Sequence, residues 1–88
     1  MQIEITKKFG KQVVKCQDEK VRARLSAFIK TIAAAQNLSE IKNLKKLKGH
    51  KEFYRIRMGE YRIGIAFRDK KIILAAFDRR SDIYKYFP

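Results

Sequence analysis

FYRIRMGEYRIG, residues 53–64, is the stretch of the chain that decides the fold, and its pattern predicts a β-hairpin. The Gly-Glu pair at 59–60 forms a two-residue turn in this prediction, because glycine at the first central position suits a type II′ turn. Residues alternate between the two faces of a strand, so Arg55 and Arg57 share a face, and the turn places Arg57 opposite Arg62. Like charges that face each other across two strands are destabilising. This arrangement therefore predicts that the arginine face binds an anion.

Further strands extend the hairpin into an antiparallel meander, predicted at 52–58, 61–67 and 71–77 with a turn at 69–70. Alternation across both turns places six apolar residues on one face, which we expect to be the core: Ile63, Ile65, Phe67, Ile72, Leu74 and Ala76. The opposite face carries the arginines beside smaller or apolar residues: Gly64, Ala66, Ile73 and Ala75. Small side chains beside arginines predict an open groove that accepts a phosphate backbone.

The first part of the chain predicts a strand and two helices that pack on this sheet as a helical hairpin. Alternation over 2–6 indicates a short strand, and Thr6 is a suitable N-cap for a helix over 7–15. Asp18 is a suitable N-cap for the longest helix, which is expected to run to about residue 35. Its apolar stripe has helical spacing and consists of Val21, Leu25, Phe28, Ile29 and Ile32.

The remaining segments are an irregular basic stretch over 37–51 and a short C-terminal helix over 81–87. Nothing in the 88 residues resembles a linker or an internal repeat, so we expect a single domain over 1–88. The predicted fold class is α+β: an N-terminal strand, a helical hairpin, a three-stranded antiparallel meander and a short C-terminal helix.

Positive charge dominates the composition, with 22 Lys and Arg against 9 Asp and Glu, a formal net charge of +13. So large an excess in a small domain attracts polyanions, and nucleic acid or an acidic protein is the expected partner. The single Cys16 and the single His50 argue against a disulfide and against a zinc site, and no cofactor is expected. No apolar run is long enough to span a bilayer and no signal peptide is evident, so we expect a cytoplasmic protein without a membrane partner.

The hairpin arginines Arg55, Arg57 and Arg62 are the first candidate site residues. A guanidinium group is planar, permanently charged and matched to phosphate oxygens, and three together can stabilise charge that develops on a phosphodiester. The alternative interpretation is a solvated outer face of the sheet, where arginine is common.

Further candidates lie in the tail and in the lysine-rich segment. Arg79 and Arg80 lie where the last strand ends, and Tyr84 follows as an aromatic residue that can stack on a base. The lysines predicted to attract RNA are Lys45, Lys46, Lys48 and Lys51, and the alternative is a solvated loop. His50 is a candidate general acid or base, because its ordinary pKa lies near neutrality, although a histidine beside a turn is more often incidental.

The order of elements and three motifs resemble the RelE/ParE superfamily of type II toxins. The motifs are LKGHK at 47–51, YRIRMGEYRI at 54–63 and RRSDIY at 79–84. The resemblance implies an enzyme, a ribosome-dependent endoribonuclease or mRNA interferase, that is neutralised by a cognate antitoxin. It implies attack of a 2′-hydroxyl on the scissile phosphate, with a 2′,3′-cyclic phosphate and a 5′-hydroxyl as products.

Carried over by position, the resemblance assigns the basic strand residues of the family to Arg55, Arg57 and Arg62. The late basic residue falls on Arg79 or Arg80, and the C-terminal aromatic residue falls on Tyr84. Arg80 and Tyr84 are therefore expected to act in catalysis with the three hairpin arginines, and Arg79 is expected to bind RNA. Relatives with ribonuclease activity often have lysine at the first two of these positions, and arginine does not readily accept a proton. If this chain cleaves RNA, Tyr84, His50 or a nearby lysine must accept it. Asp78 is a second departure, which either orients a neighbouring arginine or weakens the site.

Two alternatives to the ribonuclease stay open at the level of sequence. One is a ParE-like DNA gyrase inhibitor without catalysis of its own, because one fold serves several functions. The other is a non-toxic remnant that only binds its antitoxin and operator DNA. The expected partners are a cognate antitoxin, the ribosome and mRNA, and a hetero-oligomer with the antitoxin that binds operator DNA.

Overall fold

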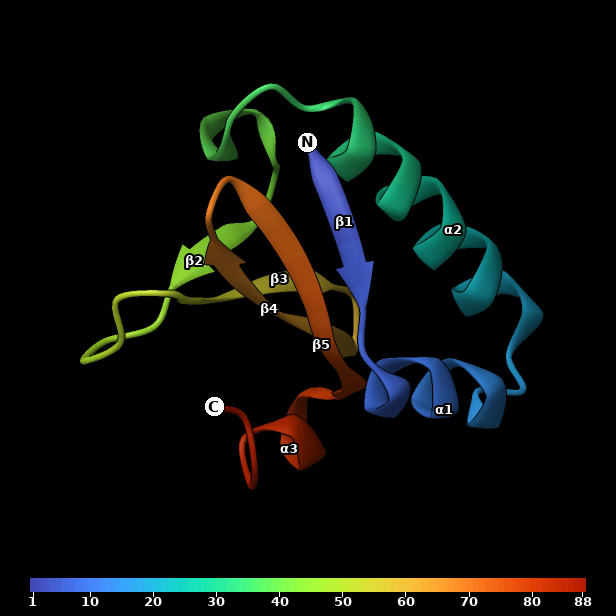
Figure 1. The fold of residues 1–88 in the computed structure, drawn as a ribbon. Helices are drawn as coiled ribbons and strands as arrows, with labels where there is room; N and C mark the ends of the chain where they lie inside the picture. The colour runs from blue at the N-terminus through green and yellow to red at the C-terminus, as the bar shows by residue number, and fades with distance from the viewer.

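A five-stranded sheet in the order β1-β5-β4-β3-β2 forms the centre of the computed structural model, which describes residues 1–88 (Figure 1). The predicted meander consists of β3 (Phe53–Met58), β4 (Tyr61–Arg68) and β5 (Lys71–Arg79). At one edge β1 (Gln2–Ile5) pairs in parallel with β5, and at the other β2 (Leu44–Lys46) pairs antiparallel with β3. The α+β fold class is confirmed, and the sheet is two strands wider than the meander.

Two helices cover one face of the sheet, α1 (Lys7–Lys15) and α2 (Glu19–Ala34) (Figure 1). Both predicted N-caps are confirmed: the Thr6 hydroxyl accepts from the Phe9 backbone N–H, and the Asp18 carboxylate accepts from two backbone N–H groups of the first turn of α2. Leu25 and Ile32 of α2 are buried against the strands. The hydrophobic core therefore lies between the helices and the sheet.

The predicted hairpin register is confirmed, since Met58 pairs with Tyr61 and Arg57 with Arg62. Gly59 has a φ of +61° and Glu60 does not have a positive φ, as a type II′ turn requires. The next turn, at 69–70, has positive φ at both residues, which is the type I′ geometry. Turn chemistry thus sets the pairing of β3 with β4 and the start of the pairing of β4 with β5.

A β-bulge in β5 overturns part of the predicted face assignment. Ile65 pairs with Leu74 but Gly64 pairs with Ala76, which leaves Ala75 without a partner in β4. Beyond the bulge every side chain changes face. Ala76, expected in the core, therefore lies on the arginine face beside Gly64, and Phe77 takes its place in the core.

Two local predictions were wrong, at β2 and at the C-terminus. The segment 37–51 contains a short 3₁₀ helix, η1 (Leu38–Glu40), and the strand β2, where a loop was expected. The strand β2 was not predicted because its sequence is rich in lysine, although lysine is typical of edge strands. The C-terminal helix is the single turn α3 (Arg80–Ile83) instead of 81–87, because the residues after it pack against α1 and the sheet individually.

Candidate nucleic-acid interface

Three arginines line one hollow of about 450 Å³ on the sheet face opposite the helices. Arg55 and Arg57 come from β3 and Arg62 from β4, and they meet because the hairpin register aligns them. Lys45 pairs with Arg55 in the register of β2 and β3, and so joins the same face. Tyr84 completes the wall from the end of α3. The structure thus brings five of the predicted site residues into one hollow.

None of the three arginines of this hollow forms an ion pair within the chain, although Asp78 lies opposite Arg62 in the register of β4 and β5. Arg62 Nη1 donates to the carbonyl oxygens of Gly59 at 2.7 Å and Tyr61 at 2.9 Å, which holds its guanidinium at the turn. The Arg55 guanidinium lies over the Tyr84 ring, 4.3 Å from its centre. The ion pairs of the chain lie elsewhere and include none of the three arginines. Cations that line one hollow and form no ion pair are suited to bind an anion.

The floor of small residues beside the hollow is covered, so the open groove expected there is absent. The Phe87 ring lies on Gly64, so closely that a Cβ built on Gly64 would be 2.7 Å from Phe87 Cε2. The same ring meets Phe53 edge-on at 5.7 Å between centres. Ala66 and Ala76 are buried. The accessible part of the face is therefore the arginine hollow itself.

Tyr86 fastens the tail to α1 and to the end of β5. Its hydroxyl donates to Asp78 Oδ2 at 3.0 Å and accepts from Gln12 Nε2 at 2.6 Å, and Lys8 Nζ lies 3.7 Å from the ring centre. Burial, helped by the Asp78 carboxylate, raises the pKa of Tyr86 to about 12. The Asp78 carboxylate accepts from the Tyr86 hydroxyl and from the Arg79 backbone N–H, and it forms no ion pair with the arginines. Its role here is to hold the tail that carries Tyr84.

The late arginines do not line the hollow. The Arg79 guanidinium carbon lies 5.7 Å from the centre of the Tyr61 ring, in a cavity it shares with Lys15 and Cys16 of the α1 region. Arg80 lies beside the first hairpin turn, with Nε 3.9 Å from a Glu60 carboxylate oxygen. Sequence proximity to the last strand end suggested a shared site, but strand alternation and the bulge direct Arg79 toward α1.

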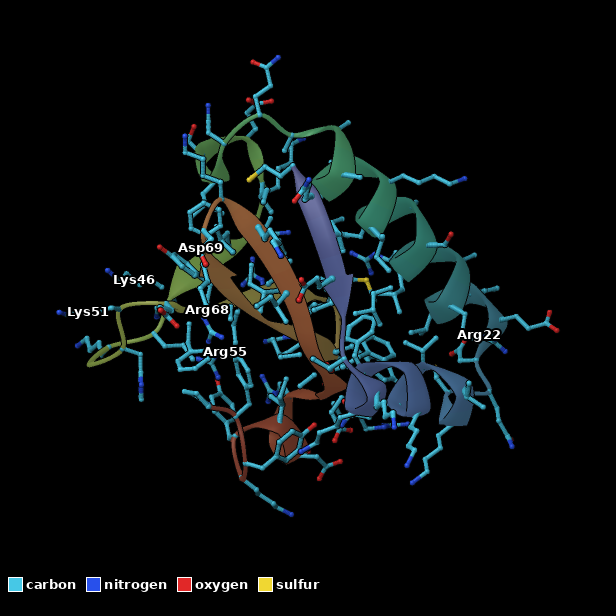
Figure 2. All side chains as sticks on the ribbon, in the orientation of Figure 1. Arg22, Lys46, Lys51, Arg55, Arg68 and Asp69 are labelled. Carbon is cyan, nitrogen blue, oxygen red and sulfur yellow. The ribbon has the colours of Figure 1, made fainter.

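The other predicted RNA-binding residues spread over the end of the molecule formed by β2 and the loop after it. Lys46 and Lys51 point outward there, whereas Arg55 lies between the strands and the C-terminal segment (Figure 2). Lys48 is also exposed. The His50 ring rests edge-on against Phe53, 5.7 Å between centres, and is not part of the hollow.

Asn43 and Leu44 also line the hollow, and sequence reasoning missed both. Asn43 has a φ of +63°, and its carbonyl oxygen accepts from the Arg57 backbone N–H at 3.2 Å. Asparagine tolerates this left-handed conformation better than most residues, which is the one signal in the sequence that could have located a turn before β2.

No group of three or more His, Cys, Asp and Glu side chains is arranged to hold a metal ion. None of the helices combines the length and the apolar character that crossing a membrane requires.

Known proteins resemble the chain in sequence and in fold, although no model of a protein family matches it. The chain is 39% identical over 69 residues to Toxin RelE3 from Methanocaldococcus jannaschii, covering 77% of this chain and 78% of that protein. A chain of the RelB–RelE antitoxin–toxin complex from Methanococcus jannaschii aligns with a TM-score of 0.81 at 34% identity, over 97% of this chain and 99% of that one. A chain of the archaeal RelE–RelB complex from Pyrococcus horikoshii OT3 has a TM-score of 0.71 at 22% identity, over 92% and 96%, and so shares the fold.

Proposed function

The chain belongs to the RelE family of toxins, the toxin component of toxin–antitoxin systems, and from this premise we propose that it is a ribosome-dependent endoribonuclease that cleaves translated mRNA. The observation that carries the proposal is the hollow with three arginines, none of them in an ion pair, beside an exposed tyrosine. The net charge of +13 exceeds what one phosphate needs and fits a large RNA surface such as the ribosome. Such an activity belongs in the cytoplasm, where translation occurs.

In the proposed reaction the 2′-oxygen attacks the adjacent phosphorus and the bond to the 5′-oxygen breaks. The products are a 2′,3′-cyclic phosphate and a 5′-hydroxyl, which takes up a proton. Arg55, Arg57 and Arg62 hold the phosphate and stabilise the negative charge that develops on its oxygens, and Tyr84 stacks on a neighbouring base. Arginine cannot readily accept the 2′-hydroxyl proton. Tyr84 and Lys45 line the same hollow, and one of them in its deprotonated form, or a ribosomal group, receives it.

The remaining basic candidates lie outside the hollow and are assigned to flanking RNA. One exposed surface lies at the β2 end of the molecule and consists of Lys46, Lys48, Lys51 and His50. A second lies beside the first hairpin turn and consists of Arg79 and Arg80. Exposed cations contribute sequence-independent, salt-sensitive attraction to phosphates. We therefore expect their single substitutions to weaken binding modestly, without the loss expected in the hollow.

Primer extension on an mRNA translated by purified ribosomes tests the activity. Wild type should produce cuts that need ribosomes, and Arg57→Ala and Arg62→Ala should reduce them at least about a hundredfold, the scale of losing one transition-state donor. Arg68→Ala is the matched control, because Arg68 lies at the far end of β4 in an ion pair with Glu52 at 2.9 Å. Cutting that survives both substitutions would refute the site. Intact mRNA with accumulating gyrase–DNA complexes would instead support a gyrase inhibitor, and harmless expression without an antitoxin would support a remnant.

We also propose that a RelB-type antitoxin is the partner, as in the complexes of the relatives. An apolar groove of about 620 Å³ runs between α1 and α2, and its wall residue Ile5 is 58% exposed. Arg22 and Lys30 line the same groove, so its chemistry suits an amphipathic segment with acidic side chains. Ile5→Glu should weaken antitoxin binding in a titration, whereas Gln36→Glu, an exposed substitution of equal charge change, should not. Equal affinities for both variants would place the antitoxin elsewhere.

A further inference from the structure

Asn43 occupies a fixed position on the rim of the arginine hollow. Its backbone adopts a φ of +63°, and its carbonyl oxygen is bonded to the Arg57 backbone N–H. Ile41 is buried two residues earlier, and Leu44 pairs with Ile56 directly after it. The side chain therefore projects from a backbone that is anchored on both sides.

The Asn43 carboxamide makes no hydrogen bond within the chain, in contrast to the carboxamides of Asn37 and Gln12. Asn37, the other asparagine, caps η1 through the Ser39 backbone N–H. Gln12 accepts from the Phe77 backbone N–H and donates to Tyr86. In Asn43 an oxygen acceptor and an amide donor stay available at the edge of the hollow.

The other groups of the hollow recognise features that all nucleotides share. Arg55, Arg57 and Arg62 suit phosphate oxygens, and an aromatic ring such as Tyr84 stacks on any base. A planar carboxamide offers an adjacent donor and acceptor, which match the edge of adenine in a bidentate pair. Unstacked single-stranded RNA exposes such edges to a protein.

We propose that Asn43 reads the edge of a base beside the scissile phosphate and so sets a sequence preference, with adenine favoured at that position. The proposal rests on the endoribonuclease function proposed above. The competing explanation is that asparagine is present only because its backbone tolerates a positive φ. Two substitutions separate these explanations, because glycine adopts the same φ without a side chain, and aspartate keeps the shape but loses the amide donor.

The test maps 5′-hydroxyl ends over all codons of an mRNA mixture cleaved on purified ribosomes. Wild type should prefer one base at one position near the cut about tenfold or more, as one bidentate pair provides. Asn43→Gly should lower cleavage at the adenine-containing codons to the level of the other codons, so that the preference falls below about twofold. Asn43→Asp should move the preference from adenine toward cytosine, whose amino group donates to a carboxylate.

Three outcomes would overturn the proposal. An unchanged preference in Asn43→Gly would leave only the backbone role. An equal loss of cleavage at all codons in both variants, with unfolding midpoints like that of wild type, would make Asn43 part of general binding. Absence of cuts by wild type would refute the endoribonuclease function itself and this proposal with it, which is distinguishable from the first two outcomes because wild type cuts in both of those.

Discussion

Gly64→Ala tests the packing of the C-terminal tail on the sheet. The new methyl carbon would lie 2.7 Å from Phe87 Cε2, 2.8 Å from Cδ2 and 2.9 Å from Cγ. Carbon atoms pack best at about 3.5 Å or more, so the ring must retreat by about 0.8 Å or swing away. Three ring atoms are affected together, and a small rotation of the ring cannot relieve all of them.

The expected cost follows from two opposing effects. Overpacking costs about 1–3 kcal/mol, and we expect the lower part of that range because Phe87 is only half-buried near the end of the chain. Alanine is favoured over glycine in a strand by about 0.5–1 kcal/mol. Gly64→Ala should therefore lower the free energy of unfolding by about 0.5–1 kcal/mol in wild type, and raise it by about 0.5 kcal/mol when Phe87→Ala has removed the ring.

Urea unfolding of wild type, both single variants and the double variant measures this coupling, which should be about 1–1.5 kcal/mol. Gly10→Ala is the control, since a Cβ at Gly10 meets nothing within 4 Å. In helix α1 it should stabilise by about 1 kcal/mol with or without Phe87. If Gly64→Ala costs the same in the presence and absence of the Phe87 ring, the ring does not cover Gly64 and the reasoning is wrong.

Three further predictions concern stability. Tyr86→Phe should lower the free energy of unfolding by about 1–2 kcal/mol at neutral pH, because Asp78 and Gln12 lose their shared partner. Since the pKa of Tyr86 is about 12 in the folded state and about 10 in an unfolded chain, its contribution is full below pH 10 and lost between pH 10 and 12. Unfolding measured at pH 9 and pH 11 should show a smaller decrease in Tyr86→Phe than in wild type. Arg57→Gln should stabilise by up to about 0.5 kcal/mol at low salt by separating two facing like charges, and an equal gain at high salt would contradict that origin. Thr6→Ala should cost about 1–2 kcal/mol in thermal unfolding, because the hydroxyl caps α1 and also donates to the Leu74 carbonyl, whereas Thr6→Ser should cost much less.

The hairpin at 53–64 illustrates what local pattern determines. Three local features suffice to align Arg57 with Arg62: a glycine in the first turn position, alternation along each strand and a two-residue turn. The structure has that register. The helix caps Thr6 and Asp18 were equally readable, because a cap bonds to N–H groups two or three residues away.

The candidate site was only partly predictable, because local pattern places some of its residues and contacts between separate segments place the others. Its arginines share a face through local alternation, but Lys45 and Asn43 reach them only because β2 pairs with β3, a contact between separate segments. Arg79 was expected beside the arginines and lies instead by Tyr61, on the side of α1.

By itself, the sequence determined the fold class, the helix starts, the hairpin register and the arginine face, because each depends on residues a few positions apart. The tertiary structure decided the bulge at Ala75, the edge strand β2 and the tail that closes over Gly64. These features depend on packing between residues far apart in the chain: the Thr6 hydroxyl donates to carbonyls at the bulge, and Tyr86 bonds to Gln12. The pattern of residues within one segment does not predict such contacts. The size of the hollow around the arginines could therefore be known only from the folded chain.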